Sequence, residues 1–363
     1  MSTSSSPPAA PVPPPISRWF GLDIHKEYLT AVAVNAEMTV TFTANKISWA
    51  QFQSWARKLF TLSDSIVIEM TTNTWEVYDF LKPLCHSVIV VHPPTISGMM
   101  PHNAKTDKHD ATQLAQLHAA GLLAKDAVWI PPAHVRELRT LIANRYKVVR
   151  MASVAKNRLH NVLHRHHLEL PTGKGTSQPF SPKQKEYWLS LPNLSATEKI
   201  EVEMNWDTIT FATAQKAKIE DLLKQMAAKD EAALLLQQIP GIGIVVAMTI
   251  LGAIGDIARF KNPTKLVGYA GLGAKVTASG GKSVGGRITK AGRKDLRHVM
   301  VEAASHAIRC HPRWKREFAR LEPRLGKNKA KVAIARRMLI MVWHLLSKAE
   351  ATTRLTRHKS RPA

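Results

Sequence analysis

The order of apolar and polar positions divides the first third of the chain into short strands and helices. Compact apolar runs bounded by turn-like residues predict strands at residues 19–24, 28–34, 38–43, 65–70 and 87–91. Apolar residues at helical spacing predict helices at residues 49–60, 74–84 and 106–121. Three strands followed by alternating helices and strands predict a mixed α/β domain at residues 17–131.

Two long helical stretches follow and form a predicted connector at residues 132–237. In residues 132–170 apolar positions recur in alternating steps of three and four, which is a coiled-coil-like pattern. A second apolar stripe predicts a helix at residues 207–237, and the intervening loop predicts an antiparallel helical hairpin. The pattern is consistent both with an oligomerisation arm and with a spacer inside one molecule.

Residues 238–347 predict a mainly α-helical domain. Its first feature, Ile239-Pro240-Gly241-Ile242-Gly243, separates two apolar helical stretches, as in a helix-hairpin-helix. Gly241 and Gly243 would let backbone N–H groups approach a DNA phosphate, although a tight turn between two helices also needs glycine. We expect the Pro- and Ser-rich residues 1–16 and the basic residues 348–363 to be disordered tails.

The charge of the chain indicates its class of partner. Lys and Arg number 51 against 27 Asp and Glu, and the net charge of +24 predicts binding to nucleic acid. The two cysteines lie far apart and form neither a disulfide framework nor a metal-binding spacing, which is typical of a reducing cytoplasm. We find no apolar run of membrane-spanning length, and therefore expect no membrane partner.

Four carboxylates carry the first candidate chemistry. Asp23 and Glu69 lie at the ends of two apolar strands, where α/β sheets gather functional groups. Asp107 and Asp110 lie one turn apart at the start of a predicted helix, an arrangement that suits a hard cation such as Mg²⁺. The alternative for this pair is the ordinary preference for acids in the first turn of a helix.

A glycine-rich basic segment contains the second group of candidate catalytic residues. Gly281-Lys282-Ser283 resembles the end of a phosphate-binding P-loop, but residue 276 is Val where that loop requires Gly, which excludes an NTPase. A serine among these glycines and cations is a sensible nucleophile for phosphoryl transfer. From the residues alone, a loop that contacts the DNA backbone without a covalent role is the favoured interpretation.

In these motifs the chain resembles the DEDD transposases of bacterial insertion sequences and the related Piv/MooV site-specific DNA invertases. The resemblance extends from about residue 17 to about residue 347. The motifs that carry it are, in order, Gly21-Leu22-Asp23-Ile24-His25-Lys26, Ile68-Glu69 with Thr72-Asn73, Lys105-Thr106-Asp107-Lys108-His109-Asp110-Ala111, Pro240-Gly241-Ile242-Gly243, Ser279-Gly280-Gly281, and Arg287-Ile288-Thr289-Lys290-Ala291-Gly292 with Leu296-Arg297.

The resemblance implies a RuvC-like (RNase H) fold for the first domain, a coiled-coil connector, and a transposase domain with a helix-hairpin-helix. It also implies that the family's four acids correspond to Asp23, Glu69, Asp107 and Asp110, which would bind Mg²⁺. The family's serine nucleophile corresponds to Ser279, with Ser283 as the alternative. Family members exchange DNA strands through a covalent serine–DNA intermediate.

The resemblance has further implications for partners. Some family members are guided by a structured bridge RNA that pairs with donor and target DNA. Their site is composite, with acids and serine from different protomers of a dimer or tetramer. The residues that we expect to contact nucleic acid are Lys105, Lys108, Gly241, Gly243, Lys282, Arg287, Lys290, Arg293 and Arg297.

We therefore expect a DNA transposase or site-specific recombinase of an insertion sequence, in the bacterial cytoplasm and associated with the nucleoid. One alternative is a RuvC-like junction resolvase or nuclease that hydrolyses DNA with water. A second is an architectural DNA- or RNA-binding protein without catalytic activity. Two core strands that end in acids argue against a pure binder, because acids that face a polyanion would weaken binding.

Overall fold

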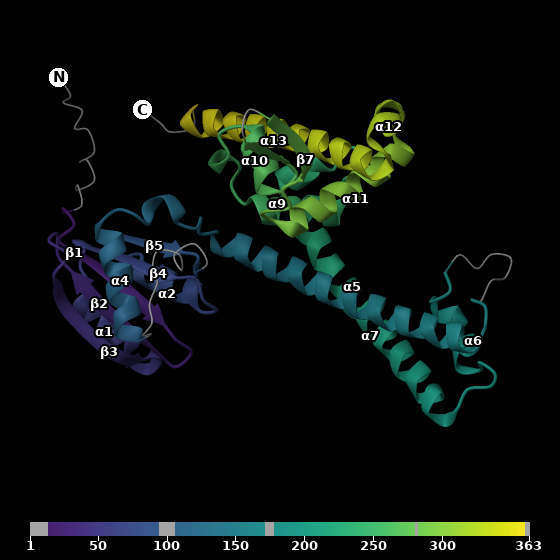
Figure 1. The fold of residues 1–363 in the computed structure, drawn as a ribbon, viewed down its shortest axis with the longest axis horizontal. Coiled ribbons are helices and arrows are strands. Elements are labelled where there is room, and N and C mark those ends of the chain that lie inside the picture. Colours follow the sequence, from purple (N-terminus) through teal and green to yellow (C-terminus); the bar gives the residue numbers. More distant parts are fainter. Residues whose placement is uncertain (1–13, 94–105, 171–177, 280–281, 360–363) are drawn as a thin grey trace, which may run out of the picture. The chain divides into compact units, whose positions relative to one another are not determined.

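The computed structural model describes residues 14–93, 106–170, 178–279 and 282–359 (Figure 1). The chain packs as two compact units, Met1–Ile130 and Pro131–Ala363. The first unit ends one residue before the boundary expected for the α/β domain. The helical connector and the C-terminal region, which the sequence analysis separated after residue 237, pack together in the second unit.

The first unit is built on a five-stranded mixed sheet with the order β3-β2-β1-β4-β5. Its strands are β1 (Arg18–Ile24), β2 (Tyr28–Val34), β3 (Val40–Ser48), β4 (Asp64–Glu69) and β5 (Ser87–Val91). Strand β4 is parallel to β1 and β5, whereas β2 is antiparallel to β1 and β3. The predicted α/β class is confirmed, but β3 runs on to Ser48 because this half-exposed edge strand does not need regular apolar alternation.

Helices cover both faces of this sheet. On one face α1 (Trp49–Leu59) and α2 (Thr74–Leu81) pack over a core that includes Phe20 and Ile66. On the other face lies α4 (Asp107–Ala119), whose Leu114 packs with Val67 of β4. The central strands are therefore buried on both faces, which explains why they form nearly continuous apolar runs in the sequence.

A partly buried histidine ties the C-terminal turn of α4 to the sheet. His118 Nε2 lies 2.7 Å from Ser65 Oγ, and Ser65 Oγ lies 2.6 Å from Ser87 Oγ. Burial penalises the charged imidazole and lowers the pKa of His118 to about 4. The imidazole is therefore neutral in the folded protein at neutral pH.

The free energy of unfolding of the first unit should fall in acid because of His118. Its pKa is lower in the folded than in the unfolded chain, so its stabilisation is complete above about pH 6.5 and decreases as the pH falls towards 4. The loss should approach about 1.4 kcal/mol per pH unit. His118→Gln, which keeps a donor near Ser65 but does not titrate, should flatten this dependence.

Urea unfolding, followed through hydrogen exchange of the β4 amides between about pH 7 and about pH 4.5, measures the effect. Equal pH dependence in the two proteins would contradict it.

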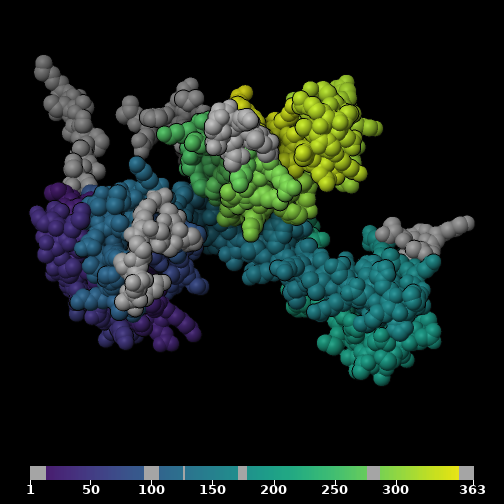
Figure 2. Space-filling view, viewed as in Figure 1, coloured from purple at the N-terminus to yellow at the C-terminus, as the bar shows by residue number. Residues whose placement is uncertain are grey.

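The second unit begins with the helical hairpin. Its elements are α5 (Ala133–Arg165), η2 (Pro182–Gln184), α6 (Lys185–Leu189) and α7 (Ala196–Ala228). Helices α5 and α7 pack along each other, and Leu159 of α5 joins Trp188 and Trp206 in a shared core. In Figures 1 and 2 the hairpin extends as an arm from the other helices of the same unit.

The prediction of a single helix at residues 207–237 is wrong about both of its ends. Helix α7 begins earlier because Ser195 and Glu198 form a capping box, in which each side chain accepts a hydrogen bond from the other residue's backbone N–H. It ends at Ala228, and α8 (Glu231–Leu236) follows as a separate helix. Asp230 Oδ1 caps this new helix by accepting a hydrogen bond from Ala233 N at 3.1 Å.

The rest of the second unit is helical apart from one β-hairpin. After α8 its elements are α9 (Ile244–Ile254), η3 (Ile257–Arg259), α10 (Pro263–Tyr269), β6 (Ala274–Ser279), β7 (Lys282–Ile288), α11 (Lys294–Cys310), α12 (Pro312–Leu325) and α13 (Lys327–Lys359). One core joins Ile250 of α9, Met300 of α11 and Met338 of α13. None of the described helices combines the length and the apolar composition of a membrane span.

Two expectations for this region are corrected. The glycine-rich serine segment is an antiparallel pair of strands rather than a loop, since glycines tolerate strand pairing that their composition does not predict. Helix α13 continues to Lys359, beyond residue 348, because the tail is rich in the helix formers Ala, Lys, Arg and Leu. The expected N-terminal tail lies almost entirely outside the described residues.

Candidate functional site

The first candidate site lies where the N-terminal half of α4 packs on β1. A Cβ atom at Gly21 of β1 would lie 2.1 Å from the carbonyl oxygen of Ala111 and 2.6 Å from the nitrogen of Ala115. Only glycine lets the helix lie this close to the strand. The helix starts at Asp107, with Thr106 as its N-cap.

The strands bring two further acids to the same face of the sheet. In the parallel pairing of β1 with β4, Leu22 is level with Ile68. The next residues along the two strands, Asp23 and Glu69, are therefore level as well. Because side chains alternate along a strand, Asp23 lies on the same face as Gly21, which is the face that α4 covers.

The side chains of Asp23 and Asp107 meet at the imidazole of His25. His25 Nε2 lies 3.0 Å from Asp23 Oδ2 and 3.4 Å from Asp107 Oδ1. The hydroxyl of Tyr28 donates a hydrogen bond to Asp107 Oδ2 at 2.9 Å. Among the described residues, Asp23, His25 and Asp107 form the group whose potential metal ligands lie within 4.8 Å of one another.

The four expected acids thus come together to different degrees. Asp23 and Asp107 share the cluster with His25. Asp110 lies close enough for its charge to raise the pKa of Asp23. Glu69 is level with Asp23 through the strand register. The assignment of all four as metal ligands stays a prediction.

His25 and Tyr28 were not among the expected site residues. His25 was available to sequence reasoning, since an imidazole two residues beyond a strand-terminal acid can reach the same cation. Tyr28 was interpreted only as the start of a strand. Its contact with Asp107 joins residues 79 positions apart, and no local pattern predicts it.

Burial and neighbouring negative charge both disfavour the ionised carboxylate of Asp23. Burial is the largest cause of the raised pKa of Asp23, and the carboxylates of Asp107 and Asp110 raise it further, while His25 lowers it. A divalent cation would relieve this repulsion, and carboxylate oxygens are its preferred ligands. The residues present therefore fit a divalent cation.

Replacing Gly21 by alanine should destabilise the first unit and weaken its cation site. The added Cβ would overlap backbone atoms of α4, which cannot turn aside as a flexible side chain would. Overpacking of this kind costs about 1–3 kcal/mol. Urea unfolding and calorimetric titration with a divalent cation measure the two effects.

Gly268→Ala is the matched control, because its Cβ would meet nothing within 4 Å. We expect this control to leave cation affinity unchanged and not to lower the free energy of unfolding, because alanine is the better helix former in α10. If Gly21→Ala unfolded at the same urea concentration as the unsubstituted protein, the packing argument would be wrong.

The turn between α8 and α9 uses its two glycines differently. Gly241 has φ +90°, and its Cβ would lie 2.3 Å from the carbonyl oxygen of Ala303 in α11. This glycine is therefore needed for helix packing. Gly243 is the N-cap of α9, and a Cβ there would meet nothing within 4 Å. Gly243 therefore has open space beside its backbone, where a phosphate could approach.

The serine motif lies at the turn of the β6–β7 hairpin. Ser279 is the last residue of β6 and pairs with Lys282, whereas Ser283 in β7 pairs with Ala278. Gly280 and Gly281, which connect the strands, lie outside the described residues. The two serines are therefore on different strands and are not cross-strand partners.

The cations expected to contact DNA differ in their exposure and in their contacts within the protein. Lys105 and the side chain of Lys282 lie outside the described part of the structure. Arg293 forms an ion pair with Asp295. The cations with exposed side chains are Lys108, Arg287 and Lys290.

Arg297 anchors the base of the β6–β7 hairpin. Its Nη1 donates hydrogen bonds to the carbonyl oxygens of Ala270 and Lys290, at 3.0 and 3.1 Å. Ala270 precedes β6 and Lys290 follows β7. The guanidinium group thus joins the chain that enters the hairpin to the chain that leaves it, which gives Arg297 a role inside the protein.

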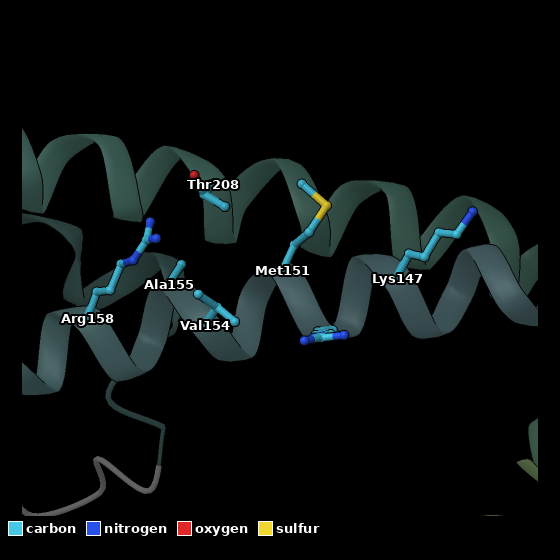
Figure 3. A pocket seen from close by; sticks show the side chains of 7 residues that line it. Lys147, Met151, Val154, Ala155, Arg158 and Thr208 are labelled. Atoms are coloured by element: carbon cyan, nitrogen blue, oxygen red, sulfur yellow. The ribbon is translucent and has the colours of Figure 1, made fainter. Parts of the chain in front are cut away.

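A groove between α5 and α7 gathers cations on the arm. It has a volume of about 400 Å³ and is lined by Lys147, Arg150, Met151, Val154, Ala155, Arg158 and Thr208. In Figure 3 Met151 of α5 and Thr208 of α7 face the groove from the two helices, and Lys147 and Arg158 lie at its opposite ends. Three cations around a partly apolar floor fit a polyanionic partner.

Fold and site together define a class: an α/β domain with an acidic site for a divalent cation, in a strongly basic chain. Two protein-family models match the sequence of this chain. The DEDD_Tnp_IS110 family model, described as a transposase, matches residues 20–168, which include all four acids. The model of the Transposase IS116/IS110/IS902 family matches residues 233–319, which include Gly241, Ser279 and Arg297.

Individual proteins agree with the family models. The chain is 23% identical over 343 residues to the transposase for insertion sequence element IS1111A of Coxiella burnetii, covering 91% of this chain and 90% of that protein. It is 26% identical over 332 residues to the pilin gene-inverting protein of Moraxella bovis, covering 87% and 91%. For the y4qE protein of Sinorhizobium fredii the identity is 27% over 258 residues, covering 70% of this chain and 58% of that protein.

The chain belongs to the DEDD transposase family of bacterial insertion sequences, to which the pilin gene-inverting protein is related. The resemblance drawn from the sequence motifs is confirmed at this level. As a member of this family the protein is an enzyme that cleaves and joins DNA.

Proposed function

We propose that the protein recombines the DNA of an insertion sequence by Mg²⁺-dependent strand cleavage and exchange, with Ser279 as the nucleophile. The observation that carries this proposal is the cluster of Asp23, His25 and Asp107 at the end of β1. A partly buried acidic cluster in a chain of net charge +24 combines a cation site with attraction for a polyanion. This combination suits metal-assisted chemistry on DNA.

In this proposal Asp23, Glu69, Asp107 and Asp110 hold the cation. Mg²⁺ bound there would polarise the scissile phosphate. The hydrogen bond from Tyr28 restricts the Asp107 carboxylate, so that its Oδ1 atom stays directed towards the cluster.

The hydroxyl group of Ser279 attacks the phosphorus atom of one DNA strand. A bond forms between the serine oxygen and phosphorus, the bond from phosphorus to the leaving strand breaks, and solvent passes the serine proton to the leaving oxygen. The phosphorus remains in a diester, now between serine and DNA, so the hydroxyl end of another strand can later attack it, with the serine oxygen as the leaving group. The position of Ser279 at a hairpin turn supports access by DNA.

In this proposal, contacts with the DNA backbone come from basic side chains and from the backbone at an open glycine. The groups that we assign to this role are Lys105, Lys108, Gly243, Lys282, Arg287, Lys290 and the groove cations Lys147, Arg150 and Arg158. Arg293 and Arg297 shape this surface through their internal contacts, and Gly241 shapes the helix-hairpin-helix turn. Binding of this kind would associate the protein with the bacterial nucleoid.

The resemblance to the family supports two further parts of the proposal. One is a bridge RNA, encoded by the element, that pairs with donor and target DNA. The other is a dimer or tetramer in which the acids and the serine come from different protomers. Neither part has a direct counterpart among the contacts within one chain.

Helix α7 adds a physical argument for oligomerisation. Ile200, Met204 and Phe211 are 56%, 65% and 53% exposed. At 3.6 residues per turn, their spacing keeps the three side chains within about 40° of one another around the helix. An exposed apolar stripe of this kind is typical of a protein–protein interface, and a second copy of the arm would bury it.

Asp107→Asn should abolish most recombination. The amide keeps the size of the side chain and an acceptor for Tyr28, but it removes a charge that holds the cation. We expect strand exchange in a plasmid assay to fall by about 100-fold or more. Loss of a residue that only supports a metal ligand costs about 10- to 100-fold, and loss of a ligand should cost at least as much. Asp221→Asn, in an exposed ion pair with Lys224 on α7, is the control and should retain activity.

Unchanged recombination in Asp107→Asn would remove the metal-site proposal.

Ser279→Ala should eliminate the covalent intermediate. With labelled DNA and Mg²⁺, the unsubstituted protein should form an adduct that survives denaturation and migrates with the protein on a gel. Ser283→Ala is the matched control and should still form it. The reverse pattern would assign the nucleophile to Ser283, and cleavage without any adduct would favour the hydrolytic junction resolvase.

A further inference from the structure

We propose that the imidazole of His25 is a direct ligand of the divalent cation. The site then has a mixed nitrogen and oxygen donor set, and it binds Mn²⁺ more tightly than Mg²⁺. This inference rests on the metal site of the proposed function, to which it adds a ligand and a metal preference.

The distances within the cluster match the geometry of a shared ion. Two ligands at right angles around an ion with bonds of about 2.1 Å lie about 3.0 Å apart. His25 Nε2 lies 3.0 Å from Asp23 Oδ2 and 3.4 Å from Asp107 Oδ1. In this arrangement His25 Nε2 and Asp23 Oδ2 share a hydrogen bond, and the three donor atoms lie within 4.8 Å of one another. The imidazole nitrogen therefore already has, with each of the two carboxylate oxygens, a separation close to that of adjacent ligands.

The fold holds the imidazole in this position from two sides. The backbone N–H of His25 donates a hydrogen bond to the carbonyl oxygen of Tyr28 at 2.9 Å, which closes the turn between β1 and β2. The rings of His25 and Tyr28 also pack, with their centroids 4.9 Å apart.

Tyr28 positions the facing carboxylate as well. Its hydroxyl group holds Asp107 Oδ2 at 2.9 Å and leaves Oδ1 towards His25. One aromatic side chain thus orients two donors of the cluster, which makes Tyr28 a positioning residue.

A nitrogen ligand changes which cation fits the cluster. Mg²⁺ is a hard ion that takes oxygen ligands and keeps several waters. Sites of mixed nitrogen and oxygen donors suit first-row transition ions, for which affinity generally rises from Mn²⁺ towards Cu²⁺. Mn²⁺ binds most weakly in that series, so its advantage over Mg²⁺ should be the smallest. A measured preference for Mn²⁺ is therefore the strictest test of a nitrogen ligand.

The experiment is a titration of the full-length protein with Mn²⁺, followed by electron spin-echo envelope modulation of the bound ion. A directly bound imidazole gives a ¹⁴N coupling, and we expect this coupling in the unsubstituted protein. His25→Gln should abolish the coupling and raise the Kd for Mn²⁺ by about tenfold or more, with a smaller change for Mg²⁺. His109→Gln is the matched control, because His109 is an imidazole in the first turn of α4 outside the cluster, and it should change neither quantity.

Tyr28→Phe separates ligation from positioning. It removes only the hydroxyl group, so the ¹⁴N coupling should persist while the Kd for Mn²⁺ rises several-fold. This variant also keeps the test informative if His25→Gln fails to fold.

The possible results distinguish this inference from the proposed function. Bound Mn²⁺ that is lost in Asp23→Asn but shows no ¹⁴N coupling would overturn the ligand role of His25 and leave the metal site intact. A coupling that persists in His25→Gln would also overturn that role. A protein that binds neither Mn²⁺ nor Mg²⁺ would overturn both the inference and the metal site.

Discussion

The close packing of α4 on β1 determines the acidic site. Gly21 provides the space, because any side chain at this position would meet the backbone of the helix at Ala111 and Ala115. The same crossing carries Asp107, in the first turn of α4, to the end of the strand that bears Asp23. At the opposite end of the helix, His118 binds Ser65 and fixes the direction of the helix over the sheet. The cation site, the glycine at position 21 and the hydrogen bond of His118 thus all depend on how α4 packs on the sheet.

In the second unit the basic character of the chain serves two purposes. Arg297 bonds to carbonyl oxygens on both sides of the β6–β7 hairpin, and Arg293 pairs with Asp295. Arg297 thereby supports the hairpin that carries the serine motif, and the charge of Arg293 is taken up by an acid of α11. Arg287 and Lys290 are exposed and stay available to a polyanion. Net charge predicts the class of partner, but it does not distinguish cations that hold the protein together from cations that hold DNA.

Much of the fold was predictable because its signals are local. The strands of the first unit are apolar runs between turn residues, and they lie close to where the sequence placed them. The errors fall where tertiary contacts or caps override periodicity. The capping box at Ser195 and the cap at Asp230 divide the second long helix differently, and the β6–β7 hairpin depends on backbone pairing that a glycine-rich sequence does not reveal.

The sequence by itself determined the family, the nucleic-acid class of partner and the four acids as candidate ligands, because each depends on residue types in a fixed order. The tertiary structure decided which donor atoms meet. It placed His25 between Asp23 and Asp107 and directed the hydroxyl of Tyr28 onto a carboxylate 79 positions away. It also showed that Gly241 serves helix packing. Such contacts depend on the angle and distance at which a helix lies on a sheet, and no pattern along the chain encodes these quantities locally.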